Sequence, residues 1–77
     1  MKVLVRTYGN LRRYLPDHQQ GAPVEVEDSV TVGALLAALG IPESEAWRVS
    51  RNGGLVDLDE MLFDGDQVSV FAPVGGG

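Results

Sequence analysis

The sequence predicts an α+β domain in two layers, with one main helix packed across a mixed sheet of four to five strands. Three observations lead to this fold class. Short segments with alternating apolar and polar residues recur along the chain, one segment near its middle has helical periodicity, and turn-forming residues separate these segments. The 77 residues suffice for one domain, and a hydrophobic content of 44% is enough for a folded core.

Two strands are expected before the helix. Residues 2–8 alternate between two faces and are rich in β-branched and aromatic side chains, which predicts the first strand. Gly9 ends it, and residues 11–15 can form about one helical turn. The segment up to Pro23 is expected to be loop. Residues 24–27 alternate apolar and acidic side chains, which predicts the second strand.

The helix has the clearest signal. Thr31 is a suitable N-cap because its hydroxyl can accept a hydrogen bond from a backbone N–H of the first turn. An apolar stripe at helical spacing follows, formed by Val32, Leu35, Leu36 and Leu39. Gly40 supplies a left-handed C-terminal residue, and Pro42 blocks continuation. We interpret the stripe as core rather than as a partner-binding face, because the sheet has no other cover.

The remaining chain predicts three strands, at residues 47–51, 55–56 and 67–72. The dipeptide Asn52-Gly53 indicates a tight hairpin between the first two of them. Trp47 is expected to cap one end of the core. Phe71 lies opposite the apolar face of the last strand, where it can contact a partner or be buried under the loop that contains Tyr14. Pro73 marks the end of pairing.

The composition excludes several kinds of chemistry. The chain has no cysteine, so disulfides, thiolate metal sites, catalytic thiols and persulfides are excluded. Its one histidine, His18, lies in a polar segment where exposure to solvent is expected rather than catalysis. The acidic residues show no spacing typical of a calcium loop. The chain therefore lacks the residues of an enzyme that acts alone.

Charge and hydropathy narrow the class of partner. A formal charge of −5 argues against binding to nucleic acid, whose phosphates repel an acidic surface. It favours a protein partner with a basic docking surface. No apolar run approaches the about 20 residues that cross a membrane, and the N-terminus lacks the apolar segment of a secretory signal. A cytoplasmic protein without a membrane partner is expected.

The C-terminus is the most informative segment. Three glycines follow Val74, and residues 73–77 can reach about 16–18 Å at about 3.3–3.6 Å each. Glycines lack a Cβ atom and can pass through a narrow tunnel. Attack of the terminal carboxylate on ATP would produce an acyl-adenylate without any side chain of this protein. We predict a domain at residues 1–74 and a flexible glycine tail at 75–77, delivered into a partner's active site.

Several motifs together resemble the MoaD/ThiS family of ubiquitin-like sulfur carriers, which have the β-grasp fold. The likeness covers essentially the whole chain. It is carried by Gly9-Asn10-Leu11-Arg12-Arg13-Tyr14-Leu15, Val30-Thr31-Val32, Leu35-Leu36, Asn52-Gly53, Leu62-Phe63-Asp64-Gly65-Asp66-Gln67-Val68 and Phe71-Ala72-Pro73-Val74-Gly75-Gly76-Gly77. Within the family, the segment after the first strand is most similar to the small, sulfur-carrying subunit of molybdopterin synthase.

The resemblance implies a mechanism and its partners. Gly77, preceded by Gly76, would be adenylated by an activating enzyme of the ubiquitin-activating type, which uses ATP, and then converted to a thiocarboxylate. The sulfur would pass to an intermediate of molybdenum cofactor synthesis held by the large subunit of molybdopterin synthase. The chain itself would bind no cofactor or metal and would not be catalytic alone. The implied partner-binding residues are Phe71, Pro73, Val74 and Gly75.

Other functions remain open at this point. Gly75 and Ala72 differ from residues common in the molybdopterin subunits, which leaves a carrier for thiamine or for another sulfur-containing metabolite possible. The same adenylate would also serve a ubiquitin-like modifier joined to lysines through Gly77. A third alternative is an interaction module with an inert tail.

Overall fold

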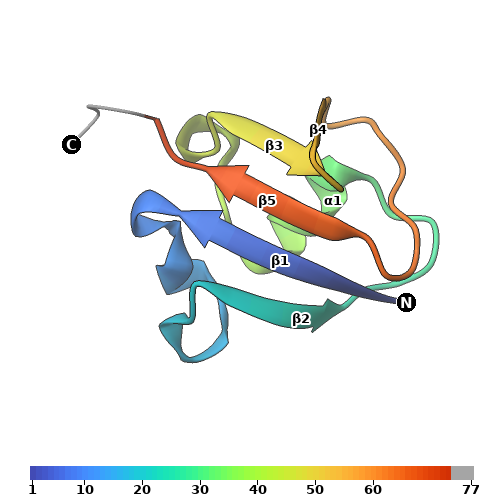
Figure 1. Ribbon diagram of the computed structural model, residues 1–77, viewed down its shortest axis with the longest axis horizontal. Coiled ribbons are helices and arrows are strands. Elements are labelled where there is room, and N and C mark those ends of the chain that lie inside the picture. The colour runs from blue at the N-terminus through green and yellow to red at the C-terminus, as the bar shows by residue number, and fades with distance from the viewer. Residues whose placement is uncertain (74–77) are drawn as a thin grey trace.

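The computed structural model describes residues 1–73, which form a five-stranded sheet with one α-helix across one face (Figure 1). The elements in chain order are β1 (Lys2–Tyr8), the 3-10 turns η1 (Gly9–Tyr14) and η2 (Pro16–His18), β2 (Gly21–Glu25), α1 (Val32–Leu39), η3 (Glu43–Glu45), β3 (Arg48–Arg51), β4 (Gly54–Val56) and β5 (Gln67–Phe71). The predicted boundary between the domain at 1–74 and the tail at 75–77 lies outside the described residues.

The strands are ordered β2-β1-β5-β3-β4 across the sheet. The central pair, β1 and β5, is parallel, and every other pair is antiparallel. The predicted mixed sheet with one main helix is therefore confirmed. Because β1 and β5 are parallel neighbours, both end at the same side of the molecule, where the described chain also ends at Pro73 (Figure 1).

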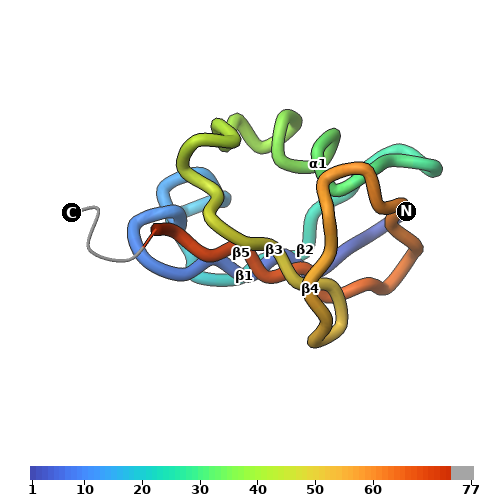
Figure 2. Tube along the Cα trace, turned by 90° about the horizontal axis from the view of Figure 1, so that it is seen from above, coloured from blue at the N-terminus to red at the C-terminus, as the bar shows by residue number. Residues whose placement is uncertain are grey.

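The helix begins and ends where the sequence predicts. The Thr31 Oγ1 atom accepts a hydrogen bond from the Ala34 N–H at 3.1 Å, and Gly40 ends the helix with a φ of 82°. The stripe on α1 packs onto β1, β3 and β5, while none of the elements within residues 1–73 covers the other face of the sheet (Figure 2). The buried core consists of Val3, Val5, Leu11, Leu15, Ala22, Val32, Leu35, Leu36, Ile41, Val49, Leu62, Val68 and Val70.

The second strand differs from the prediction, since it spans Gly21–Glu25 rather than 24–27. The presence of Pro23 had favoured a loop. In the structure Pro23 lies opposite Leu4, whose N–H donates to the Asp66 carbonyl oxygen on the far side of β1. A residue at that position of an edge strand needs no N–H for pairing, so proline is tolerated there.

Two turn motifs are tied together by side chains. Asn52 and Gly53 have φ angles of 52° and 91°, as the predicted hairpin turn requires. The nearly buried Asp66 carboxylate accepts hydrogen bonds from the Phe63 N–H at 2.8 Å and the Asn52 amide at 3.0 Å. The Asn52 side-chain oxygen accepts from the Gln67 N–H at 2.9 Å. These residues therefore hold the start of β5 against the β3–β4 hairpin, which is a structural role.

Within residues 1–73, no helix combines the length and the apolar character that crossing a bilayer requires.

Candidate functional site

The last residues of β1 and β5 form the surface from which the C-terminal segment leaves the sheet. Tyr8 and Phe71 are partners in the parallel register, and their rings stack with centroids 4.7 Å apart and an interplanar angle of 10°. Val68 and Val70 point into the core, so Phe71 faces the open side of the sheet. The outward orientation expected from the alternation is confirmed, and Phe71 packs on Tyr8 rather than under the loop that contains Tyr14.

Gly9 lies directly against Ala72, the residue that follows β5. Its φ is +75°, a conformation that L side chains rarely adopt, and a Cβ atom added to it would lie 2.8 Å from the Cβ atom of Ala72. The backbone beyond β5 therefore passes closely over Gly9. The sequence marks this glycine as the end of a strand and as part of a family motif, but it does not indicate the contact with Ala72, which lies at the other end of the chain.

A polar network borders the same exit. The Arg13 guanidinium donates to the Tyr14 hydroxyl at 3.0 Å and to the Glu45 carboxylate, which also accepts from the Tyr14 hydroxyl at 3.0 Å. Desolvation lowers the pKa of Arg13, but the adjacent Glu45 and Tyr14 more than offset this and raise it. The network thus joins η1 to η3 beside Pro73. A hollow of about 580 Å³ lies there, lined by Gly9, Asn10, Arg13, Ser44, Glu45, Ala72 and Pro73.

The uncovered side of the sheet is both apolar and cationic. We call it the open face and define it by the outward side chains of Leu4, Arg6, Tyr8, Arg48, Leu55 and Phe71. Leu55 is 63% exposed and Leu4 is 48% exposed. The acidity of the whole chain therefore does not extend to this face, and a surface complementary to it would be apolar with negative rather than positive charge.

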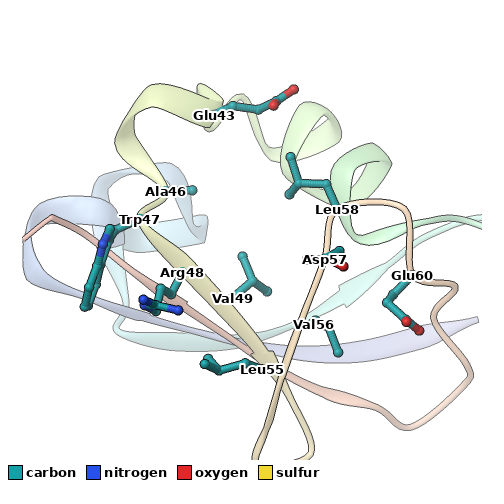
Figure 3. Close-up of a pocket in the computed structure, with 10 residues that line it drawn as sticks. All are labelled: Glu43, Ala46, Trp47, Arg48, Val49, Leu55, Val56, Asp57, Leu58 and Glu60. Carbon is teal, nitrogen blue, oxygen red and sulfur yellow. The ribbon is translucent and has the colours of Figure 1, made fainter.

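Trp47 does not cap the core, contrary to the prediction. It is 54% exposed. Its ring lies beside the guanidinium of Arg48, whose Cζ atom is 4.8 Å from the ring centroid (Figure 3). The strand β3 starts one residue later than expected, so the alternation that would have turned Trp47 inward does not include it. Trp47 instead enlarges the exposed aromatic surface near the exit.

The predicted site residues fall partly within the described chain. Phe71 belongs to the open face and Pro73 is exposed at the end of the described residues. Val74, Gly75, Gly76 and Gly77 lie outside the described residues. In the part of the chain that the structure covers, no group of three or more His, Asp or Glu side chains is arranged to hold a metal ion.

Residues 5–77 match the model of the ThiS family. No curated protein sequence gave a significant match.

Several solved structures are similar over nearly the whole chain. A putative molybdopterin converting factor subunit 1 from Pyrococcus furiosus is 26% identical, with a TM-score of 0.73 over 95% of this chain and 98% of that one. Small archaeal modifier protein 1 of Haloferax volcanii is 25% identical, with a TM-score of 0.72 over the same shares. A chain from the complex of molybdopterin-converting factor subunits 1 and 2 of Helicobacter pylori is 30% identical, with a TM-score of 0.62 over 100% of both chains. The fold is the ubiquitin-like β-grasp.

Proposed function

Since the chain belongs to the ThiS family of ubiquitin-like sulfur carriers, we propose that it carries sulfur as a thiocarboxylate on Gly77. The observation that carries the proposal is the family match, which extends through the glycines to residue 77. The exit geometry supports it. Ala72, the residue after β5, packs so closely on Gly9 that only glycine fits there, and an exposed apolar face lies beside this contact.

The chemistry would take place in a partner's active site. The Gly77 carboxylate attacks the α-phosphate of ATP bound by an activating enzyme, which forms an acyl-adenylate and releases pyrophosphate. A sulfur nucleophile then displaces AMP to give the thiocarboxylate. Transfer of that sulfur to an acceptor, with oxygen supplied by water, regenerates the carboxylate. This domain contributes docking and reach, and the ATP stays with the partner in the cytoplasm.

Intact-mass measurement tests this function. The chain is co-expressed with its cognate activating enzyme and a sulfur source, and the expected product is heavier by the replacement of one oxygen with sulfur. The same expression without the activating enzyme should yield only the unmodified mass. Failure to detect the heavier species with every cognate activating enzyme would refute the proposal.

We further propose molybdopterin synthesis as the pathway and a larger synthase subunit as the docking partner. The supporting observation is the similarity to chains described as subunit 1 of molybdopterin converting factor, one of them in a complex with subunit 2. In this proposal the chain is the sulfur-donating subunit and the large subunit holds the acceptor. Reconstitution of molybdopterin formation from the loaded chain and that subunit is the test. Sulfur transfer to an acceptor of the thiamine pathway, and not to the large subunit, would contradict the molybdopterin assignment and assign the chain to thiamine synthesis.

A protein modifier is the second candidate, because one similar structure is described as a small archaeal modifier protein. The same Gly77 adenylate would then react with lysine side chains and form isopeptide bonds. Branched glycyl remnants on lysines, detected by mass spectrometry after digestion, are expected in this case. A proteome without such remnants would exclude the modifier function under the conditions sampled.

Replacement of Phe71 by alanine is expected to weaken binding to the large subunit by about tenfold, or about 1–2 kcal/mol, as is typical for an aromatic residue in a docking surface. The variant removes the ring that stacks on Tyr8 at the tail exit. Isothermal titration calorimetry measures the change. Phe63→Ala is the control. Phe63 is a phenylalanine with 64% of its surface exposed, but it lies before the start of β5, whereas Phe71 lies at the end of β5. Equal losses for both variants would contradict the assignment.

A further inference from the structure

The turn between β3 and β4 contains the one asparagine of the chain that a glycine follows. Asn52 and Gly53 are both exposed to solvent, and their positive φ angles are those of a two-residue hairpin turn. Figure 2 shows this turn projecting from the sheet on the side opposite α1. The only other asparagine, Asn10, is followed by Leu11. The two asparagines therefore differ in how easily the next backbone nitrogen reaches the side-chain amide.

The Asn-Gly pair can undergo an intramolecular reaction. The Gly53 backbone nitrogen loses its proton and attacks the Cγ atom of Asn52, which forms a five-membered succinimide and releases ammonia. Glycine favours this attack because it has no Cβ atom to obstruct the approach, whereas the branched side chain of Leu11 obstructs it at Asn10. Water then opens the ring at one of its two carbonyl carbons and leaves aspartate or isoaspartate. The reaction consumes water alone and needs no oxidant, cofactor or enzyme.

Hydrogen bonds to the start of β5 hold Asn52 in place. Its backbone N–H donates to the Gln67 carbonyl oxygen at 2.8 Å, and its side-chain oxygen accepts from the Gln67 N–H at 2.9 Å. Its side-chain nitrogen donates to the nearly buried Asp66 carboxylate at 3.0 Å. A carboxylate can only accept and a backbone N–H can only donate. Residue 52 must therefore offer a donor and an acceptor on one short side chain, as asparagine does and aspartate does not.

We propose that Asn52 is a deamidation site whose reaction is slowed by its hydrogen bonds to Asp66 and Gln67, and whose product separates the β3–β4 hairpin from β5. The attack requires the amide to turn toward the Gly53 nitrogen, and so to leave both partners. Aspartate at this position presents a second carboxylate to Asp66 where the amide donated, and like charges this close repel. Isoaspartate also lengthens the backbone of a two-residue turn, which shifts the register that the turn sets. The lost contacts are therefore not restored.

This inference goes beyond the proposed function and does not depend on the thiocarboxylate. It makes the stability of the molecule depend on its age, because each deamidated chain loses the same contacts permanently. Gln67 begins β5 and Phe71 ends it, so the weakened junction lies at the other end of the strand from the stacked rings of Tyr8 and Phe71. Deamidation is therefore expected to increase unfolding without altering that surface on the molecules that remain folded.

Incubation of the full chain in oxygen-18 water at mildly alkaline pH tests the site. One sample is native, the other is unfolded in urea, and peptide mapping by mass spectrometry follows the exchange of the amide nitrogen for labelled oxygen. Asn52 is expected to convert in both samples, at least about tenfold faster in the unfolded one because the native contacts must open first, while Asn10 stays unmodified. No conversion of Asn52 in the unfolded chain would remove the site. Equal rates in both samples would show that Asp66 and Gln67 do not slow the reaction.

Asn52→Asp reproduces the aspartate product and tests its effect on the fold. It is expected to raise the equilibrium constant for unfolding, measured in urea at neutral pH, by at least about tenfold, because Asp66 loses its donor and gains a neighbouring negative charge. Asn10→Asp is the matched control, since it adds the same charge at the other exposed asparagine, and it should leave the constant nearly unchanged. Equal effects of the two substitutions would overturn the proposed loss of contacts. Neither measurement involves an activating enzyme, so both test the site independently of the proposed function.

Discussion

Removal of one glycine from the C-terminus is expected to lower thiocarboxylate formation by more than about 100-fold, although the shortened chain still ends in Gly-Gly. Each residue of an extended chain spans about 3.3–3.6 Å, and a misplacement of about 1 Å at a reacting centre can cost about 100-fold in rate. A domain docked on the partner fixes where the tail begins, and the close packing of Ala72 on Gly9 holds the residue after β5 in place. Intact-mass quantification of the loaded chain measures the effect.

Gly75→Ala is the control for this deletion. The variant keeps both the length of the tail and its Gly-Gly end and alters only one implied partner contact, so its loading should fall far less than that of the shortened chain. Circular dichroism should be unaffected in both variants, because the core is formed by residues 3–70. Full loading of the shortened chain would show that the docked position of the domain does not determine which tail residue arrives at the reacting centre.

Replacement of Gly9 by alanine is expected to destabilise the fold by about 2–5 kcal/mol. The left-handed conformation costs a non-glycine residue about 1–2 kcal/mol, and overpacking against the Ala72 Cβ atom, 2.8 Å away, adds about 1–3 kcal/mol. If Ala72 moves to make room, the chain beyond β5 leaves the sheet in another direction. Loading is therefore expected to fall together with stability, as measured by urea denaturation and by intact mass.

Two further variants separate the effects of strain and contact. Gly40 has a similar φ of +82°, but no atom lies within 4 Å of a Cβ atom added there. Gly40→Ala should therefore lose only the about 1–2 kcal/mol of stability that the left-handed conformation costs, and loading should be unchanged. Adding Ala72→Gly to Gly9→Ala removes the close approach and should recover the packing part of the loss. No recovery in the double variant would show that Ala72 is not the residue that requires a glycine at position 9.

The elements that the sequence predicted well are those with local causes. The helix from Thr31 to Gly40 depends on a cap, a stripe and a terminating glycine, all within one short segment. The hairpin at Asn52-Gly53 is likewise specified by two adjacent residues. The start of β2 was missed because the tolerance for Pro23 depends on its register with β1, and Trp47 was misplaced because β3 begins after it.

The candidate site was predictable in its chemistry but not in its surroundings. The glycine end and the outward position of Phe71 follow from composition and alternation. The Arg13–Glu45 ion pair and the Gly9–Ala72 approach join residues far apart in sequence, and nothing local marks them. The clustering of cationic and apolar side chains on the open face arises only when the strands are paired, so the net charge of −5 gave no indication of it.

The parallel pairing of β1 with β5 has a consequence for how the protein is made. The first strand to be synthesised finds its central neighbour only in the last, with Val5 opposite Val68. Such distant pairing slows folding. It also means that a chain interrupted during translation before β5 cannot complete the sheet, because β5 separates β1 from β3. The surface formed by Tyr8 and Phe71 therefore exists only after β5 has been synthesised, so an activating enzyme that docks there would not recognise chains that end before β5.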